Sequence, residues 1–285
     1  MKKILSLLMI LLLCGCDITE DFTDKYIYTT IYPVEYATNM LYKEHSNIIS
    51  VYPNGADTKY EVTDKKKEKY AQGEIFIYSG VAKEAHLAKD LLNKNNKIKL
   101  IDATKGLVTQ KEISAIWLDP SNYLMLCSNI KSSLIDYTDN VYEKEEIEKN
   151  YKKLNETISE LDVLLYDIGK NGNYDTILTT NDIFSYLSKY NINVISIDQD
   201  NQSIDKAYAN AKKLIKDKKI QYIYTLEGDK LSDTQKKFIT DNALIQVEIN
   251  DLYTLTDKER EENKDYISLM NEIIDNYKKE LYKKN

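Results

Sequence analysis

The sequence predicts an α/β protein of two lobes, each built on a mostly parallel four-stranded sheet, joined by one long rigid helix. The first observation is that short apolar, β-branched runs alternate with amphipathic stretches along the whole chain. The second is that this alternation occurs in two halves, and parallel strands require a crossover helix between them. The third is a helical stripe of apolar residues at the centre of the chain.

The first sixteen residues predict a lipoprotein signal peptide. Lys2 and Lys3 form a charged start, and residues 4–13 form an apolar run too short to span a bilayer. The processing site ends at Cys16, whose thiol carries the lipid once the leader is removed. A plain secretory signal or a short buried helix is the alternative. We therefore expect a lipid-anchored protein on the outer face of the cytoplasmic membrane, with residues 17–24 as a polar tether.

The first lobe is expected to span residues 25–141. Its predicted strands are residues 26–32, 48–52, 74–78 and 98–101, which are rich in Ile and Tyr. Its predicted helices are the amphipathic stretches near residues 34–43, 63–71, 83–93 and 120–137. Because a helix follows each strand, we expect the strands to lie parallel.

A linking helix is predicted over residues 142–168. Its apolar residues recur at steps of three and four, namely Ile147, Tyr151, Leu154, Ile158, Leu161 and Leu165. This stripe fits a helix that lies along its own protein, although a coiled-coil partner is an alternative. A single long helix is a stiff connection, so we expect a small tilt between the lobes and no large hinge closure.

The second lobe is expected to span residues 169–285. Its predicted strands are residues 176–179, 193–197, 221–225 and 244–249. Its predicted helices are residues 182–190, 203–217, 232–240 and 257–281.

Charge, cysteines and histidines exclude several classes of function. The chain has 39 basic and 46 acidic residues, a balance that argues against binding nucleic acid. Cys14 leaves with the leader and Cys16 carries the lipid, so Cys127 remains alone as a buried apolar residue without a disulfide. His45 and His86 are the two histidines, and they do not form a Ser-His-Asp or His-Cys pattern. We therefore expect a protein that is not an enzyme.

Several segments resemble the solute-binding lipoproteins of zinc and manganese ABC importers. They are residues 31–34, 55–57, 60–61, 75–80, 116–120 and 265–270, in the order found in that family. The Trp-Leu-Asp-Pro element of residues 117–120 and the linking helix are the most specific of these features. The resemblance implies two α/β lobes with a ligand cleft between them, one metal ion in the cleft and an ABC permease as partner.

The metal-ligand positions are where this sequence departs from the family it resembles. The three histidine positions fall on Lys59, Ala115 and Asn181, and the carboxylate position falls on Asn250 or, with a one-residue slip, on Asp251. Zinc prefers anionic or imidazole donors, which alanine, asparagine and a charged lysine do not supply. The resemblance therefore implies a cleft with no confident metal ligand, lined by Lys59, Tyr60, Ala115, Asn181, Asp182, Asn250 and Asp251.

Three hypotheses about function follow from this set of residues. In the first, the protein is the receptor of an importer whose cleft holds a different small polar or zwitterionic solute. In the second, it is a structural or interaction lipoprotein without cargo, and Lys59 pairs with Asp182 or Asp251 to hold the lobes closed. In the third, a divalent ion binds hard oxygen donors, namely Asp57, Asp182, Glu227 and Asp251.

Overall fold

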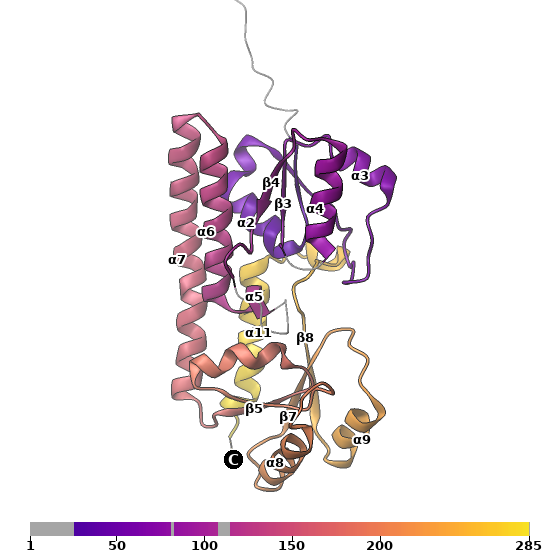
Figure 1. The fold of residues 1–285 in the computed structure, drawn as a ribbon. Helices are drawn as coiled ribbons and strands as arrows, with labels where there is room; N and C mark the ends of the chain where they lie inside the picture. Colours follow the sequence, from indigo (N-terminus) through magenta and orange to yellow (C-terminus); the bar gives the residue numbers. More distant parts are fainter. Residues whose placement is uncertain (1–25, 81–82, 108–114, 285) are drawn as a thin grey trace, which may run out of the picture.

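The computed structural model describes residues 26–80, 83–107 and 115–284 and shows two α/β lobes arranged along one long helix (Figure 1). The expected leader, the lipidation site Cys16 and the tether of residues 17–24 lie outside the described residues. Among the residues that the structure describes, there is no helix with the length and apolar character needed to cross a membrane.

The first lobe contains a four-stranded sheet in the order β2-β1-β3-β4. Its strands are β1 (Tyr26–Thr29), β2 (Asn47–Ser50), β3 (Ile75–Tyr78) and β4 (Lys99–Asp102). All three pairs are parallel, so the predicted parallel sheet is confirmed. The helices of this lobe are α2 (Tyr32–Tyr42), η2 (Lys43–His45), α3 (Asp64–Tyr70), α4 (Lys83–Lys94), α5 (Ala115–Leu118) and α6 (Pro120–Tyr137).

The second lobe repeats this topology with the sheet order β6-β5-β7-β8, again with parallel pairs throughout. Its strands are β5 (Thr176–Thr179), β6 (Asn193–Ser196), β7 (Tyr222–Leu226) and β8 (Ile245–Ile249). Its helices are η3 (Asp182–Tyr190), α8 (Ile204–Lys216), α9 (Asp233–Asp241), α10 (Asp257–Glu261) and α11 (Tyr266–Leu281).

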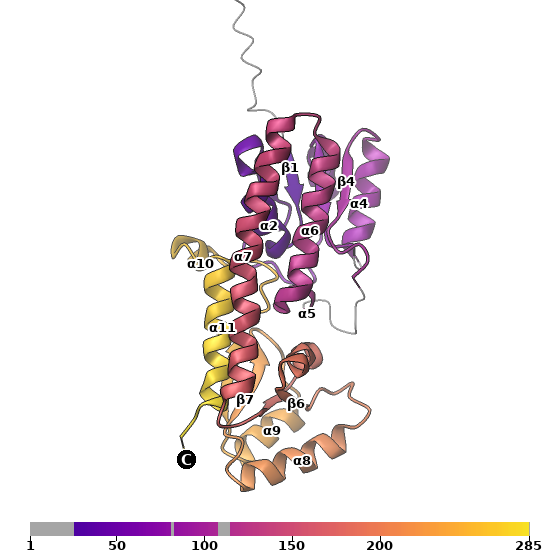
Figure 2. The same ribbon diagram turned by 90° about the vertical axis from the view of Figure 1, so that its left-hand side faces the viewer.

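The predicted linking helix is α7 (Val141–Asn171), which runs beside both lobes (Figures 1 and 2). Asn140 caps its N-terminus, where the side-chain oxygen accepts hydrogen bonds from the backbone N–H groups of Tyr142 and Glu143. The predicted stripe is buried apart from Tyr151, which is half-buried. The stripe packs on α2 and α6 in the first lobe and on η3 and α11 in the second. One apolar core therefore extends through both lobes.

The C-terminal segment differs from the single helix predicted over residues 257–281. It forms α10 and α11, separated by a break at which Asn263 has a left-handed φ of 54°. Each helix begins with its own capping box, formed by Thr256 with Glu259 and by Asp265 with Ser268. Local hydrogen bonds at the two start sites thus divide the segment. The segment of residues 182–190 also differs, because it is a 3₁₀ helix.

Cys127 is fully buried on α6, as predicted, and burial raises the pKa of its thiol well above the ordinary value. An unreactive, protonated thiol is the result.

Candidate functional site

Lys59 and Tyr60 lie in the loop that follows β2. Asp57 shapes this loop, because its carboxylate accepts a hydrogen bond from the backbone N–H of Lys59 at 2.9 Å. The Lys59 side chain is exposed and forms no ion pair with Asp182 or Asp251. The structure therefore does not show the pairing that the hypothesis of a cargo-free, Lys59-closed protein requires. The Tyr60 hydroxyl is likewise engaged locally, since it accepts a hydrogen bond from Lys66 at 2.8 Å.

Ala115 is the half-buried first residue of the short helix α5 and supplies no polar side chain. Two residues later, the indole N–H of Trp117 donates to the backbone oxygen of Asp251 at 2.6 Å. The hydroxyl of Tyr266 donates to the backbone oxygen of Trp117, also at 2.6 Å. Helix α5 thus brings the Ala115 position next to the segment that carries Asp251.

Asn181 and Asp182 follow β5, where Asn181 caps η3. Its side-chain oxygen accepts from the backbone N–H of Ile183 at 2.9 Å, and its amide group bonds to the carboxylate of Asp229. The backbone N–H of Asp182 donates to Asp198 at 3.2 Å. Both predicted residues therefore lie at the end of the second sheet, beside Asp198 and Asp229, which were not among the predicted site residues.

Each strand of the second sheet is followed within three residues by an acid. These residues, which we call the strand-end acids, are Asp182 after β5, Asp198 after β6, Glu227 and Asp229 after β7, and Asp251 after β8. The carboxyl ends of parallel strands meet at one edge of a sheet, where α/β proteins bind ligands. This position after a strand was the sequence signal that would have identified Asp198 and Asp229.

The strand-end acids form a region of negative charge. None of them forms an ion pair with a lysine or arginine of the described residues. Burial raises the pKa of Asp251, and the nearby charges of Asp229 and Glu227 raise it further. Burial also raises the pKa of Asp229, with Asp198 adding to the shift. The half-buried carboxylate of Asp251 is therefore held in its ionised form only at an energetic cost.

The acids are not arranged as a metal site within the part of the chain that the structure describes. No group of three or more His, Cys, Asp or Glu side chains there has the geometry to hold an ion. Asp57, which the third hypothesis includes, lies in the first lobe and bonds to the backbone of its own loop. The four-carboxylate divalent site is therefore not assembled among these residues.

Asn250 and Asp251, the two candidates for the fourth family position, have different surroundings. The Asn250 amide donates to Glu259 at 2.8 Å, and its oxygen accepts from the backbone N–H of Leu252 at 2.7 Å. Asn250 lines an open groove of about 290 Å³ between β8, α10 and α11. Asp251 lies instead with the strand-end acids and accepts from the backbone N–H of Tyr253 at 2.9 Å.

Comparison with known proteins identifies the family. A model described as component A, periplasmic, of a zinc-uptake complex (ZnuA) matches residues 27–280. The chain belongs to the ZnuA family. This membership confirms the resemblance seen in the sequence, and it makes the chain a non-enzymatic, solute-binding component of the ABC importer class. No curated protein matches the sequence.

Solved structures share the fold of this ZnuA-family chain. The zinc-bound ZnuA-like domain of Streptococcus pneumoniae AdcA is 24% identical, over 91% of this chain and 99% of that one, with a TM-score of 0.72. The metal-dependent lipoprotein YcdH from Bacillus subtilis is 20% identical over 90% and 99%, with a TM-score of 0.74. AdcAII from S. pneumoniae is 19% identical over 91% and 100%, with a TM-score of 0.72. At these identities the likeness shows the fold alone.

In this ZnuA-family chain, the Trp-Leu-Asp-Pro element joins the two lobes. Besides the contacts of Trp117, the buried carboxylate of Asp119 pairs with Lys189 of η3 and accepts a hydrogen bond from Tyr190 at 3.5 Å. The same carboxylate caps α6 through the backbone N–H of Ser121 at 3.0 Å. The polar groups of this motif therefore hold the second lobe against the start of α6.

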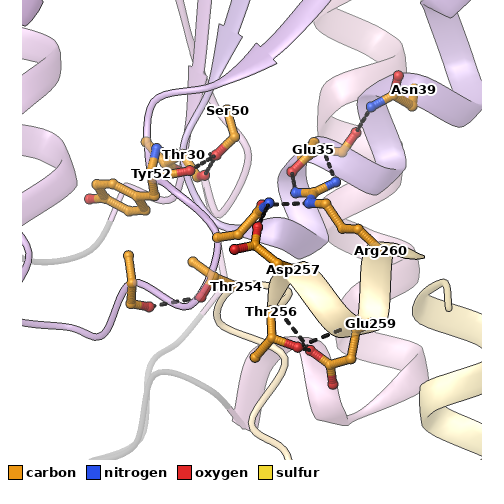
Figure 3. A network of polar contacts seen from close by, with 12 residues as sticks. Thr30, Glu35, Asn39, Ser50, Tyr52, Thr254, Thr256, Asp257, Glu259 and Arg260 are labelled. Carbon is orange, nitrogen blue, oxygen red and sulfur yellow. Dashed lines mark hydrogen bonds and ion pairs between the residues drawn. The ribbon is translucent and has the colours of Figure 1, made fainter. Parts of the chain in front are cut away.

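A second connection involves Arg260, the chain's single arginine, on α10 (Figure 3). Its guanidinium donates to both carboxylate oxygens of Glu35 on α2, at 3.0 and 2.8 Å. Asn54 joins the network by accepting from Arg260 at 2.5 Å and donating to Asp257 at 2.7 Å. The planar guanidinium suits this two-point contact, which a lysine cannot reproduce.

We expect Arg260→Lys to lower the free energy of unfolding by about 1–2 kcal/mol, because one of two charge-assisted hydrogen bonds to a mostly buried carboxylate is lost. The matched control is Lys258→Gln on the same helix, where the pair with Glu262 is largely exposed. That control should change stability by less than about 0.5 kcal/mol. Urea unfolding of both variants measures the difference, and equal effects would contradict a role for the bidentate pair.

Proposed function

We propose that this ZnuA-family protein is the lipid-anchored receptor of an ABC importer and that it captures a small zwitterionic or cationic solute at the strand-end acids. The observation that carries this proposal is a set of carboxylates at the ligand-binding edge of a parallel sheet with no paired cation among the described residues. A solute ammonium group would supply the missing positive charge. The partial burial of Asp251 favours such a partner, because removing an unpaired charge from water is costly.

Lys59 offers the opposite charge that a zwitterion needs. Lys59 is exposed, and the loop that carries it contacts the segment after β8, where the backbone N–H of Gly55 donates to Leu255 at 2.8 Å. In the same segment, the Thr254 hydroxyl donates to the backbone oxygen of Ala56 at 2.8 Å. A solute carboxylate directed toward Lys59 and an ammonium directed toward Asp251 would then use both lobes.

Zinc is less well supported as the solute, although relatives of this fold bind it. Of the positions that the family resemblance implies, Lys59, Ala115 and Asn181 supply no anionic or imidazole donor. Asp251 remains as the one carboxylate of the set. A single strong donor does not meet the tetrahedral requirement of a zinc site.

The proposal is tested by elemental analysis of residues 17–285, the mature chain without its lipidated Cys16, followed by thermal melts. The additives are zinc, manganese, EDTA and a panel of amino acids and small amines. A ligand at a hundred times its Kd stabilises the folded state by about 2.7 kcal/mol, which gives a clear rise in melting temperature. We expect the rise with an amino acid or amine. Stoichiometric zinc or manganese removed by EDTA, with a fall in melting temperature, would overturn the proposal, and no shift with any additive would favour the cargo-free hypothesis.

The lipid anchor has a separate test. We expect Cys16→Ser either to leave the leader uncut or to release the protein from the membrane, because the serine hydroxyl does not take the place of the lipidated thiol. Cys14→Ser is the matched control, since Cys14 precedes the expected cleavage site and should leave anchoring unchanged. Membrane fractionation and intact-mass measurement report the result. Normal processing and anchoring of the Cys16 variant would contradict the assignment.

A further inference from the structure

A buried carboxylate joins the two lobes beside the loop of Lys59. Glu84, at the start of α4, is 4% exposed and accepts hydrogen bonds from the hydroxyls of Tyr52 and Tyr253, each at 3.1 Å. Tyr52 follows β2 in the first lobe, whereas Tyr253 follows β8 in the second. The two rings stack with their centroids 5.7 Å apart. One carboxylate thus fixes two aromatic rings that come from different lobes.

The neighbouring residue, Lys83, supplies a cation to the same place. Its ammonium donates to the backbone oxygens of Thr58, at 2.5 Å, and Tyr60, at 2.8 Å. It also lies 5.2 Å from the ring centroid of Tyr52 and 5.9 Å from that of Tyr253. Backbone oxygens and aromatic faces are the groups that bind an ammonium ion. The loop after β2 is therefore folded around a positive charge of the protein itself.

The position of Lys83 at the N-terminus of α4 does not favour the stability of that helix. Lys83 is the first residue of α4, where the helix dipole disfavours a positive charge. The adjacent carboxylate of Glu84 and the two backbone oxygens compensate for that placement. A cation in the first turn is thus explained by its contacts with the loop and not by the stability of the helix.

We infer that Lys83 is the positioning residue that orders the loop of residues 53–61 and fastens it to Tyr253, so that this wall of the solute site is formed without cargo. The inference rests on the proposed function only in naming the loop as part of the site. In the hypothesis of a protein without cargo, Lys59 is the cation that holds the lobes together. In this inference, Lys83 has that role. The shape of the loop then depends on an intramolecular ammonium group and not on a bound ion.

Hydrogen exchange of the solute-free mature protein tests this inference. We expect Lys83→Met to speed amide exchange in residues 53–61 by about tenfold, because charge-assisted hydrogen bonds to two backbone oxygens are lost. Exchange in α7 should not change. Lys59→Met is the matched control, since it removes an exposed lysine from the same loop and should leave exchange as in the unmodified protein. Lys83→Arg, which retains a cation with several donors, should restore slow exchange.

Two results would overturn the role of Lys83. One is unchanged exchange of residues 53–61 in Lys83→Met, and the other is a failure of Lys83→Arg to restore slow exchange where Lys83→Met loses it. Should Lys83→Met not fold, Lys83→Gln keeps an uncharged donor group for the backbone oxygens and should give an intermediate rate. A rate equal to that of the unmodified protein would overturn the inference. The measurement needs no solute, so its outcome is separate from the search for cargo.

Discussion

Trp117→Ala is expected to lower the free energy of unfolding by about 3–5 kcal/mol, the usual range for removing a large buried aromatic side chain. Trp117 is 1% exposed and lies in the apolar core that extends through both lobes. Its indole N–H also holds the backbone oxygen of Asp251, so the substitution removes a direct link between the lobes. Equilibrium unfolding in urea, monitored by circular dichroism, measures the loss.

Trp117→Phe separates packing from hydrogen bonding. Phenylalanine retains an aromatic ring but has no N–H donor, so we expect a smaller loss together with faster amide exchange around Asp251. Met125→Ala on α6 is a surface control, because its side chain is 51% exposed. A loss below about 1 kcal/mol for Trp117→Ala would show that the motif does not support the joining of the lobes.

Asp251→Asn is expected to weaken solute binding by about 100-fold or more, because the ammonium group of the solute loses a half-buried ionic partner. The same substitution should stabilise the free protein at neutral pH. Burial and the charges of Asp229 and Glu227 make the ionised form of Asp251 unfavourable in the folded state. A neutral amide removes that penalty and can still accept the hydrogen bond from Tyr253. Functional groups that lower stability in this way are common at binding sites.

The pH dependence has a definite sign. The pKa of Asp251 in the folded protein is raised above its ordinary value of 3.8, so the folded state holds the proton more tightly than the unfolded state. The loss of stability caused by the ionised carboxylate is complete at pH values above the pKa in the folded protein. It disappears as the pH falls toward 3.8. The gain from Asp251→Asn should therefore be largest at pH 7 and shrink toward pH 4.

Asp200→Asn is the control, because it makes the same charge change at an exposed residue. Thermal melts from pH 4 to pH 7 compare the two variants. Equal stability of Asp251→Asn and the unmodified protein at pH 7 would contradict the assignment of an unpaired, half-buried carboxylate.

Much of the architecture was predictable, because its signals are local. The step of three and four residues from Ile147 to Leu165 predicted α7, and every residue of that stripe except Tyr151 is buried. All eight strands lie within or next to their predicted ranges. The break between α10 and α11 was missed because the capping box of Asp265 with Ser268 competes with the continuing apolar pattern. Residues 1–25 lie outside the described part of the chain, so the signal peptide stays a prediction.

The candidate site was predictable only in part. The family resemblance led to Asn181, Asp182 and Asp251, which the fold brings to the end of one sheet with Asp198 and Asp229. It also led to Asn250, which the structure places in the groove with Glu259. Asp251, the next residue along the chain, is the one that lies with the strand-end acids. A shift of one residue after a strand reverses the direction of a side chain, and no local pattern specifies it.

The sequence by itself determined the fold class, the two parallel sheets and the helix between them, because hydrophobic periodicity and strand–helix alternation act within short stretches of chain. The tertiary structure alone decided which charges meet. Lys83, and not Lys59, lies against the ring of Tyr253 from the second lobe, and Arg260 finds Glu35 at a separation of 225 residues. Pairings over such distances depend on how the lobes dock, and the energies that select them arise only when burial removes water from both partners.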